Sequence, residues 1–385
     1  MKNGFKRIVK ISCTALLTAS MAAGCSAGAA KSTSVTKTIT VWANGSDNVR
    51  VQFEQQIEKF NASQNDYTAK LEFITSGTGA QSLSDRIIAA KKAGQTDTDY
   101  DVVEVSDNDA ATYLSQAGDD IFTKIDASKL SNYSNLTVQS SYSDYLVPYR
   151  GTTVVLAYNS DTVKNPPKTA DELYQWIKDN PGRFAYNTPS SGGAGGSFVL
   201  TAVYNFLPEE ALTSTDTKWE EQWDQGFNLL KELHPYLYQS SGKTVYPNKN
   251  QGTLDLLASK EVDMIPAWAD MTLSQIKQGT LPDSIKITQI DPSFTGSTVG
   301  LAIPSIGSNQ DGAYAFINYM LSADAQNIAL DSMAAVPVIS YDKLDPDLTK
   351  SIEDLKISSY RMSSIGSLST DLNDKWDSEI GTLNW

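Results

Sequence analysis

The 385-residue sequence predicts an α/β fold with two lobes, each a mainly parallel sheet flanked by helices. Strand patterns and helix patterns alternate between residues 38 and 114, and a sheet covered by helices on both faces arises from that order. A second alternating series begins near residue 169. About 350 residues lie beyond the N-terminal segment, which is more than one core usually organises.

The first series contains three short strands, rich in apolar and β-branched residues, and three helices whose apolar residues recur every three to four positions. In chain order the six segments are 38–43, 49–60, 71–74, 82–92, 101–105 and 107–114.

A crossing between the lobes is predicted at Tyr145–Asn159, where Pro148 and Gly151 precede a β-branched run. Further crossings are expected at 264–270 and around 335–340. The expected division assigns 38–148 and about 270–335 to the first lobe, and about 155–264 and about 340–385 to the second.

The second series begins with a helix that Thr169 caps, with Asp171 and Glu172 in its first turn. The remaining predicted elements are a strand at 183–187, helices at 197–207, 218–233 and 252–259, strands at 262–268 and 299–303, and helices at 312–321 and 323–333.

The N-terminus has the pattern of a signal peptide at residues 1–24, because four basic residues precede the apolar run Ile11–Ala23, which is too short to span a bilayer. Residues 22–25, Ala-Ala-Gly-Cys, resemble a bacterial lipobox, although Ala22 stands where Leu is usual. The resemblance implies a diacylglyceryl group on Cys25 and a flexible tether over 25–37. The alternative is ordinary secretory cleavage with an unmodified Cys25.

Cysteine use and charge exclude several classes of site. Cys13 and Cys25 are the two cysteines of the sequence, so the body after the tether has neither disulfides nor thiolate metal sites. Without residues 1–24 the chain keeps 27 Lys and Arg against 45 Asp and Glu, a formal charge of −18. Such a chain repels nucleic acid, and no nucleic-acid partner, metal or cofactor is expected.

The order and spacing of six segments carry a resemblance to a known family. The segments are Thr38–Trp42, Tyr100–Ser106, Val147–Asn159, Gly252–Trp268, Gly300–Pro304 and Asp311–Leu321. They cover nearly all of residues 38–340, and their pattern resembles the bacterial extracellular solute-binding proteins of family 1, in the branch of polyamine, thiamine, iron and sugar binders. The resemblance implies the type II periplasmic-binding fold and a role as the substrate-binding component of an ABC importer.

This resemblance also implies the partners and the location. A small-molecule ligand and ABC permease subunits are the expected partners, the protein is expected to be a monomer, and the lipid on Cys25 holds it at the extracellular face of the cytoplasmic membrane.

In such folds the ligand lies beyond the carboxyl ends of the strands, between the lobes. Trp42 and Trp268 are the strongest candidates, because aromatic rings at strand ends offer flat faces to sugars, rings or cations. The full set of candidate ligand-binding residues is Trp42, Asn44, Ser76, Gly77, Ser106, Asp107, Asn108, Ser190, Ser191, Gly192, Trp268, Asp270 and Ser297.

The Ser/Gly segment from Thr188 to Ser197 has little side-chain bulk and leads into an apolar helix. Free backbone N–H groups and the helix dipole are expected there to meet oxygen atoms of the ligand. A phosphate, a carboxylate or sugar hydroxyls would all suit such a segment.

Comparison with the polyamine binders of the family disfavours a polyamine, because their acidic positions fall here on Ser190–Gly195 and on Val299. A buried ammonium group without partners is costly. We therefore expect a sugar or a related polar organic molecule, with thiamine-like or phosphorylated compounds as the next alternatives. Asp107 and Asp270 remain as anchors for one positive group or for hydroxyls, or as helix caps.

An enzymatic role is not expected. With His234 as its one histidine and no cysteine after the tether, the body lacks material for Ser-His or Cys-His catalysis. A secreted glycoside hydrolase with paired carboxylates and a lipid-anchored sensor on the same fold are the alternatives from other classes.

Overall fold

The computed structural model describes residues 37–76, 81–352 and 360–383. The predictions for residues 1–36, namely the signal peptide, lipidated Cys25 and nearly all of the tether, lie outside the described residues, as does Gly77. Within the described ranges, no helix combines the length and the apolar character needed to cross a membrane.

The first predicted series is confirmed element by element. Its strands and helices are β1 (Lys37–Gly45), α1 (Asp47–Ser63), β2 (Tyr67–Thr75), α2 (Leu83–Lys92), β3 (Val102–Ser106) and α3 (Asp107–Ala117). β1 pairs in parallel with β2 on one side and with β3 on the other, so the carboxyl ends of all three strands reach the same edge of the sheet.

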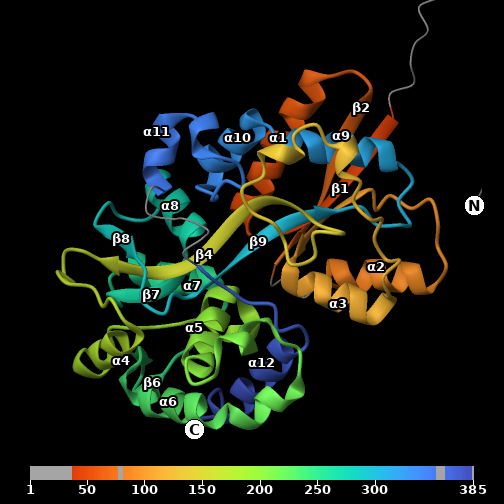
Figure 1. Cartoon of the computed structure of the whole chain (residues 1–385). Helices are drawn as coiled ribbons and strands as arrows, with labels where there is room; N and C mark the ends of the chain where they lie inside the picture. Colours follow the sequence, from red (N-terminus) through yellow and green to blue (C-terminus); the bar gives the residue numbers. More distant parts are fainter. Residues whose placement is uncertain (1–36, 77–80, 353–359, 384–385) are drawn as a thin grey trace, which may run out of the picture. The chain divides into compact units, whose positions relative to one another are not determined.

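Two long strands continue this sheet across the molecule, as Figure 1 shows for β4 (Val147–Asn159) and β9 (Thr295–Ala302). β9 pairs antiparallel with both β3 and β4. Beyond Thr153 the partner of β4 changes from β9 to β7 (Met264–Trp268), and β8 (Ile285–Thr288) pairs on its other side. The main strand order is therefore β2-β1-β3-β9-β4-β7.

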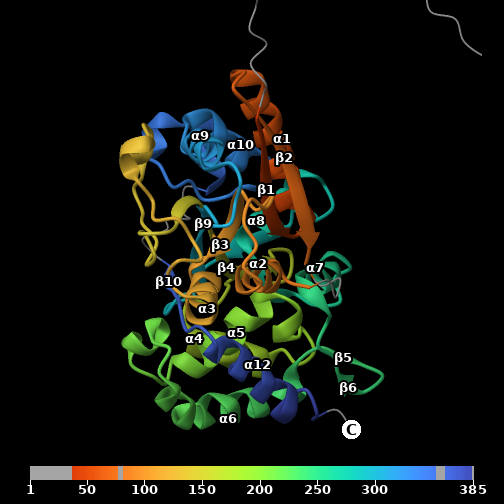
Figure 2. The same ribbon diagram turned by 90° about the vertical axis from the view of Figure 1, so that its right-hand side faces the viewer.

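The remaining elements cover this sheet and its far end (Figure 2). They are α4 (Ala170–Asp179), α5 (Gly193–Tyr204), α6 (Asp224–Leu233), β5 (Gln239–Ser240), β6 (Lys243–Thr244), α7 (Lys249–Ala258), α8 (Ala269–Lys277), α9 (Gln310–Met320), α10 (Ala323–Met333), α11 (Pro346–Thr349), β10 (Arg361–Met362) and α12 (Leu368–Glu379). The predicted cap of α4 is confirmed, because the hydroxyl of Thr169 accepts the backbone N–H of Glu172 at 3.1 Å.

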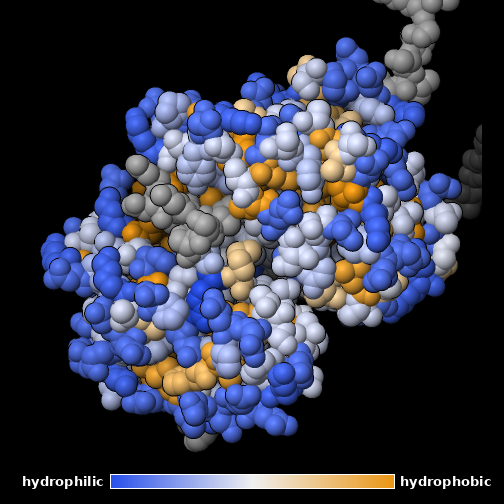
Figure 3. Space-filling view, in the orientation of Figure 1, coloured by the Kyte–Doolittle hydropathy of each residue, from blue (hydrophilic) through white to orange (hydrophobic). Residues whose placement is uncertain are grey.

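Two large hydrophobic cores lie at the two ends of β4. One packs β1 and α1 against α9 and α10, and the other packs α4, α5, α6 and α12 together. Smaller clusters lie beside α2 and α3 next to the first core, and beside α7 and β7 next to the second. We call the elements around the first core the first lobe and those around the second core the second lobe. On the face shown in Figure 3, hydrophilic residues cover most of the outer surface, as expected for such cores.

Strand pairing in the second lobe differs from the expected mainly parallel sheet. β4 pairs antiparallel with β7 and β8, and parallel pairing among the described residues of this region consists of the short pairing of β10 with the start of β9 and single bridges such as Phe184 with Met264. The reason is that β4 enters this lobe from the first one and so sets the direction of its neighbours. The predicted strand at 183–187 is reduced to that bridge, and the predicted helix at 218–233 begins as a 3₁₀ helix, Thr217–Gln222, ahead of α6.

The crossings after β4 also differ from the sequence expectation. β9 crosses between the lobes, whereas β7, at the predicted crossing of 264–270, pairs with the second-lobe half of β4. The segment predicted to cross around 335–340 packs in the first core, where Val336 exchanges backbone hydrogen bonds with Gly151. Tyr360 still packs in the first core, and Ile365 is the next residue of the second core.

The contact between α5 and α6 generates a test of the second core. A Cβ atom on Gly226 of α6 would lie far too close to the Cα atom of Val203 of α5. Gly226→Ala should therefore lower the free energy of unfolding by about 1–3 kcal/mol, as overpacking does. The matched control is Gly196→Ala, because the nearest atom to its new Cβ is 3.7 Å away. Urea unfolding of both variants measures the effect, and equal stabilities would contradict this packing.

Candidate ligand-binding site

A cavity of about 450 Å³ lies where β4 passes between the lobes. First-lobe residues reach it from the junctions β1–α1 and β3–α3, and second-lobe residues reach it from the first turns of α5, α7 and α8. Its lining consists of Asn44, Gly45, Ser46, Asp47, Asn48, Val49, Thr75, Ser76, Glu104, Ser106, Asp109, Arg150, Thr152, Ser191, Gly192, Gly193, Lys249, Asn250, Gln251, Trp268, Asp270, Met271, Ser297 and Val299.

Most of the residues selected from the sequence come together in this lining. These are Asn44, Ser76, Ser106, Ser191, Gly192, Trp268, Asp270 and Ser297. Three candidates are not part of it, namely Trp42, Asp107 and Ser190, and the side chain of Asn108 lies outside what the structure describes. A second cavity, of about 1030 Å³, lies beside Tyr360 and Arg361, and none of the selected residues lines it.

Two of the candidates outside the lining have structural contacts instead. The indole of Trp42 donates to the carbonyl oxygen of Asp99 at 3.0 Å, and its ring packs 5.1 Å from that of Tyr100. The carboxylate of Asp107 accepts the Ser140 hydroxyl at 2.5 Å and the backbone N–H of Ser141 at 2.9 Å. These hydrogen bonds to Asp107 hold the loop at Ser140 and Ser141 against the start of α3.

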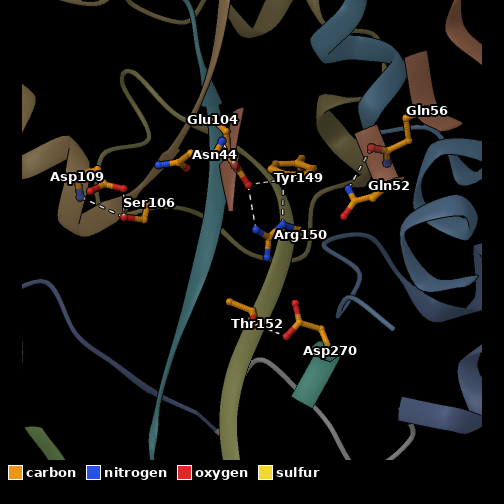
Figure 4. Close-up of polar contacts among 10 residues, drawn as sticks. All are labelled: Asn44, Gln52, Gln56, Glu104, Ser106, Asp109, Tyr149, Arg150, Thr152 and Asp270. Carbon is orange, nitrogen blue, oxygen red and sulfur yellow. Dashed lines mark hydrogen bonds and ion pairs between the residues drawn. The ribbon is translucent and has the colours of Figure 1, made fainter. Parts of the chain in front are cut away.

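A buried ion pair that sequence reasoning missed lies at the centre of the cavity wall. Figure 4 shows Arg150 of β4 beneath Glu104 of β3, and its Nη2 donates to Glu104 Oε1 at 2.9 Å. The Tyr149 hydroxyl donates to the same oxygen at 2.6 Å and accepts Arg150 Nε at 2.8 Å. Among the described residues, Nη1 of Arg150 has no hydrogen-bond partner, so its two N–H groups are available to a ligand.

A β-bulge explains how two consecutive residues reach one carboxylate. Neighbouring side chains of a regular strand point to opposite faces. The register of β4 against β9 shifts between Pro148 and Arg150, which leaves Tyr149 as the extra residue. A bulge bends the strand and changes the direction of its side chains, and here Tyr149 and Arg150 both contact Glu104.

The charges of this wall affect one another strongly. Burial on its own lowers the pKa of Arg150, but its contacts with Tyr149 and Glu104 raise that pKa above its ordinary value, so the guanidinium stays charged. Burial raises the pKa of Asp270, although Arg150 opposes this effect. The Asp270 carboxylate also accepts the Thr152 hydroxyl at 3.3 Å. Each of the three charged residues Glu104, Arg150 and Asp270 is 6–7% exposed.

The second-lobe wall is built from the Ser/Gly segment and the starts of α5 and α7. A Cβ on Gly193 would lie 2.8 Å from the Trp268 ring, so the absence of a side chain lets the indole lie directly against the first turn of α5. The Ser191 hydroxyl accepts the backbone N–H of Lys249 at 2.9 Å, and Asn250 Oδ1 accepts the backbone N–H of Ala194 at 3.1 Å. These bonds join the two helix starts into one wall.

Four helices begin at this cavity without a side-chain cap, namely α1, α5, α7 and α8. The first N–H groups of a helix have no partner within it, and the helix dipole favours negative charge there. Acidic residues supply that charge in the first turns of α1 and α8, at Asp47 and Asp270. The first turns of α5 and α7 contain no acidic residue.

Glu104, Arg150 and Lys249 were absent from the residues selected from the sequence. One signal was available for the first two, because each is a single charged residue within an otherwise apolar strand. Such residues are almost never buried without a partner. Lys249 follows a loop and has no comparable signal.

Comparison with known proteins assigns the chain to a family. The model of a family described as bacterial extracellular solute-binding protein matches residues 55–353, which is most of the chain. The chain belongs to this family. An Escherichia coli K12 relative, Protein YnjB, is 26% identical over 189 residues, so the alignment spans about half the length of both chains, 46% of each.

Solved structures with a similar fold cover nearly the whole chain. They include an ABC transporter from Clostridium perfringens (16% identity, 90% of this chain and 100% of that one, TM-score 0.65). An ABC transporter substrate-binding protein from Bradyrhizobium japonicum is 19% identical, with 90% of this chain and 100% of that one covered and a TM-score of 0.65. PotD from Streptococcus pneumoniae is 16% identical, with 89% of this chain and 99% of that one covered and a TM-score of 0.64. The predicted two-lobed type II fold is thereby confirmed.

The raised pKa of Asp270 predicts a stability effect that depends on pH. In the unfolded chain the pKa of an Asp side chain is near its ordinary value, about 3.9. Because the pKa of Asp270 is higher in the folded protein, its ionised carboxylate lowers the free energy of unfolding at high pH, and this destabilisation disappears as the carboxylate becomes protonated in acid. Asp270→Asn should therefore melt at a higher temperature than the natural protein at pH 8, with a gain that shrinks toward pH 4.

Asp263 is the matched comparison, because hydrogen bonds from Arg183 and Thr162 outweigh burial and lower its pKa. Asp263→Asn should lose stability at pH 8 and approach the natural protein in acid. Thermal unfolding across this pH range measures both variants. A loss of stability in Asp270→Asn that is the same at pH 4 and pH 8 would contradict the description of Asp270.

Proposed function

We propose that the protein is the extracellular substrate-binding component of an ABC importer, which captures a small polar solute and delivers it to a permease. The observation that carries the proposal is the cavity at the crossing strands, with buried Glu104, Arg150 and Asp270 in its wall, in a chain of the extracellular solute-binding family. Cavities with a few buried polar groups and perturbed pKa values are typical ligand sites.

Closure of the lobes around the solute is part of this proposal. β4 and β9 join lobes that have separate cores, so small changes in their backbone angles would move one cavity wall against the other. A solute that contacts both walls favours the closed arrangement, because it binds that state more tightly. The closed protein would then present a surface to the permease that the open protein lacks.

Proteins that share this fold bind solutes of several chemical classes. Structural neighbours include a GABA receptor, a periplasmic thiamin binding protein and a protein in complex with iron and citrate. A sugar or related polar organic molecule is supported here by the half-buried Trp268 ring and by the amides of Asn44 and Asn250 in the lining. Ser191 and Gly192 stand where a polyamine would need acidic groups, which supports the lower expectation for polyamines.

A lipid anchor at Cys25 and a monomeric state complete the proposal. The basic and apolar N-terminal segment and residues 22–25 support export and lipidation. A diacylglyceryl group on the sulfur of Cys25, followed by the polar tether, would hold the protein at the membrane and leave the lobes free to open and close.

The first test of the proposal compares two tryptophans. A thermal-shift screen against sugars, phosphorylated compounds, thiamine and polyamines identifies a ligand, because a ligand that binds the folded state raises its melting temperature. Calorimetry should then show at least tenfold weaker binding for Trp268→Ala, whose ring lines the cavity. Trp42→Ala is the matched control and should bind normally, because Trp42 lies outside the lining. Unchanged affinity in Trp268→Ala would contradict this site.

The second test concerns the anchor. Cys25→Ser removes the thiol that lipidation requires, so the protein should appear in the soluble fraction or the medium instead of the membrane fraction. Cell fractionation with immunoblotting measures the distribution, and Cys13→Ser is the control because that thiol lies within the predicted signal peptide. Membrane retention of Cys25→Ser equal to that of Cys13→Ser would contradict the lipid anchor.

A further inference from the structure

The cavity wall contains charged residues of both signs, some of which have no ion-pair partner among the described residues. Its charged residues are Asp47, Glu104, Asp109, Arg150, Lys249 and Asp270. Asp47 pairs with Arg50 at 2.6 Å, and Glu104 pairs with Arg150 at 2.9 Å. Among the described residues, Asp109, Asp270 and Lys249 have no ion pair. Glu104 is thus neutralised by Arg150, which leaves Asp109 at the start of α3 as an unpaired carboxylate and Lys249 at the start of α7 as the unpaired cation among these residues.

Lys249 occupies a position that local physics disfavours. It is the first residue of α7, where the helix dipole is positive and a further positive charge is unfavourable. Its φ angle of +63° is uncommon for a residue with a side chain. Among the described residues, no hydrogen bond or ion pair compensates its ammonium group. Violations of local rules are typical of functional sites, and a bound anion would remove the electrostatic conflict here.

The surroundings of Lys249 suit an anionic group. The first turns of α5 and α7 lie at the cavity and contain no acidic residue, so no carboxylate there opposes an anion, and the helix dipoles favour one. The backbone N–H groups of Ala194, Gly195 and Lys249 already donate to Asn250, Asn187 and Ser191, so the side chain of Lys249 is the donor that these turns offer. The buried Arg150 adds two N–H donors on Nη1 that no described residue accepts. A planar guanidinium with free donors binds carboxylate and phosphonate oxygens well.

The acidic groups suit an amine on the same ligand. Asp109 at the start of α3 accepts the Ser106 hydroxyl at 2.8 Å and has no cation beside it among the described residues. Asp270 is buried at the start of α8, with Arg150 as its nearby opposing charge. Asp109 is therefore the carboxylate of this wall that a ligand ammonium can pair with away from Arg150.

We propose that the solute is a small zwitterion, whose carboxylate or phosphonate group binds at Lys249 and the first turns of α5 and α7 while its amine faces Asp109 at the start of α3. This inference rests on the proposed function, because it names the solute class of the same cavity. An uncharged sugar would leave Lys249 uncompensated, and a polyamine would place ammonium groups near both Lys249 and Arg150.

The test is calorimetry with purified protein and ligands that differ by one charge. The zwitterions are the ω-amino acids from glycine to 6-aminohexanoate and 2-aminoethylphosphonate. Butyrate and butylamine carry the anionic or the cationic group alone. At least one zwitterion should bind with a Kd at least tenfold below those of both single-charge compounds, because it gains contacts with both walls.

Variants of both walls complete the test. Lys249→Gln and Asp109→Asn should each weaken zwitterion binding at least tenfold, with melting temperatures of the free protein unchanged. Lys243→Gln is the matched control, because Lys243 is exposed on β6 and absent from the lining. Lys249→Arg keeps the charge and should restore most of the affinity.

The outcomes separate this inference from the proposed function. If a sugar, thiamine or spermidine binds in a manner that depends on Trp268 while the zwitterions do not, the zwitterion inference is wrong and the capture function stands. If a single-charge compound binds as tightly as every zwitterion, the inference is also wrong. If no compound of either panel binds, both proposals are contradicted.

Discussion

The buried contact between Glu104 and Arg150 is the interaction on which the binding site depends. It joins β3 of the first lobe to the strand that crosses between the lobes, at the point where a bulge directs Tyr149 and Arg150 to one carboxylate. Removing one partner of such a pair costs about 3–5 kcal/mol, because the other charge stays buried and unpaired. The pair therefore keeps a fixed positive group in the wall, and Asp270 lies within its influence.

Backbone geometry supplies the rest of the site. The parallel strands β1, β2 and β3 end at one edge of the sheet, which brings Asn44, Ser76 and Ser106 together in the lining. In the second lobe, Gly193 allows the Trp268 ring to lie against the first turn of α5, so a flat apolar face adjoins a positive helix end. The result is a cavity that offers an aromatic face together with an unpaired carboxylate, Asp109, and an unpaired ammonium group, Lys249, as proposed for a zwitterion.

Sequence patterns predicted well the helices and strands that show a clear local periodicity. They predicted less well the features that depend on pairing or packing between segments far apart in the sequence. Asn44 and Trp268 lie at the ends of strands that their apolar runs make visible, whereas Trp42 packs against Tyr100 because alternate residues of β1 face the first core. Arg150 depends on a bulge, which arises from the pairing of β4 with β9 and leaves no trace in periodicity. The first half of β9, Thr-Gly-Ser-Thr, lacks the apolar run that marks a strand, so its crossing was not predicted.

The most direct measurement of the account is a crystal structure of the protein with the ligand that the binding screen identifies. If the cavity beside β4 is the binding site, ligand density should lie in it, within hydrogen-bonding distance of Arg150 Nη1 and Lys249 and in contact with the Trp268 ring. Density in the second cavity beside Tyr360 and Arg361, with the first cavity holding only solvent, would contradict the account.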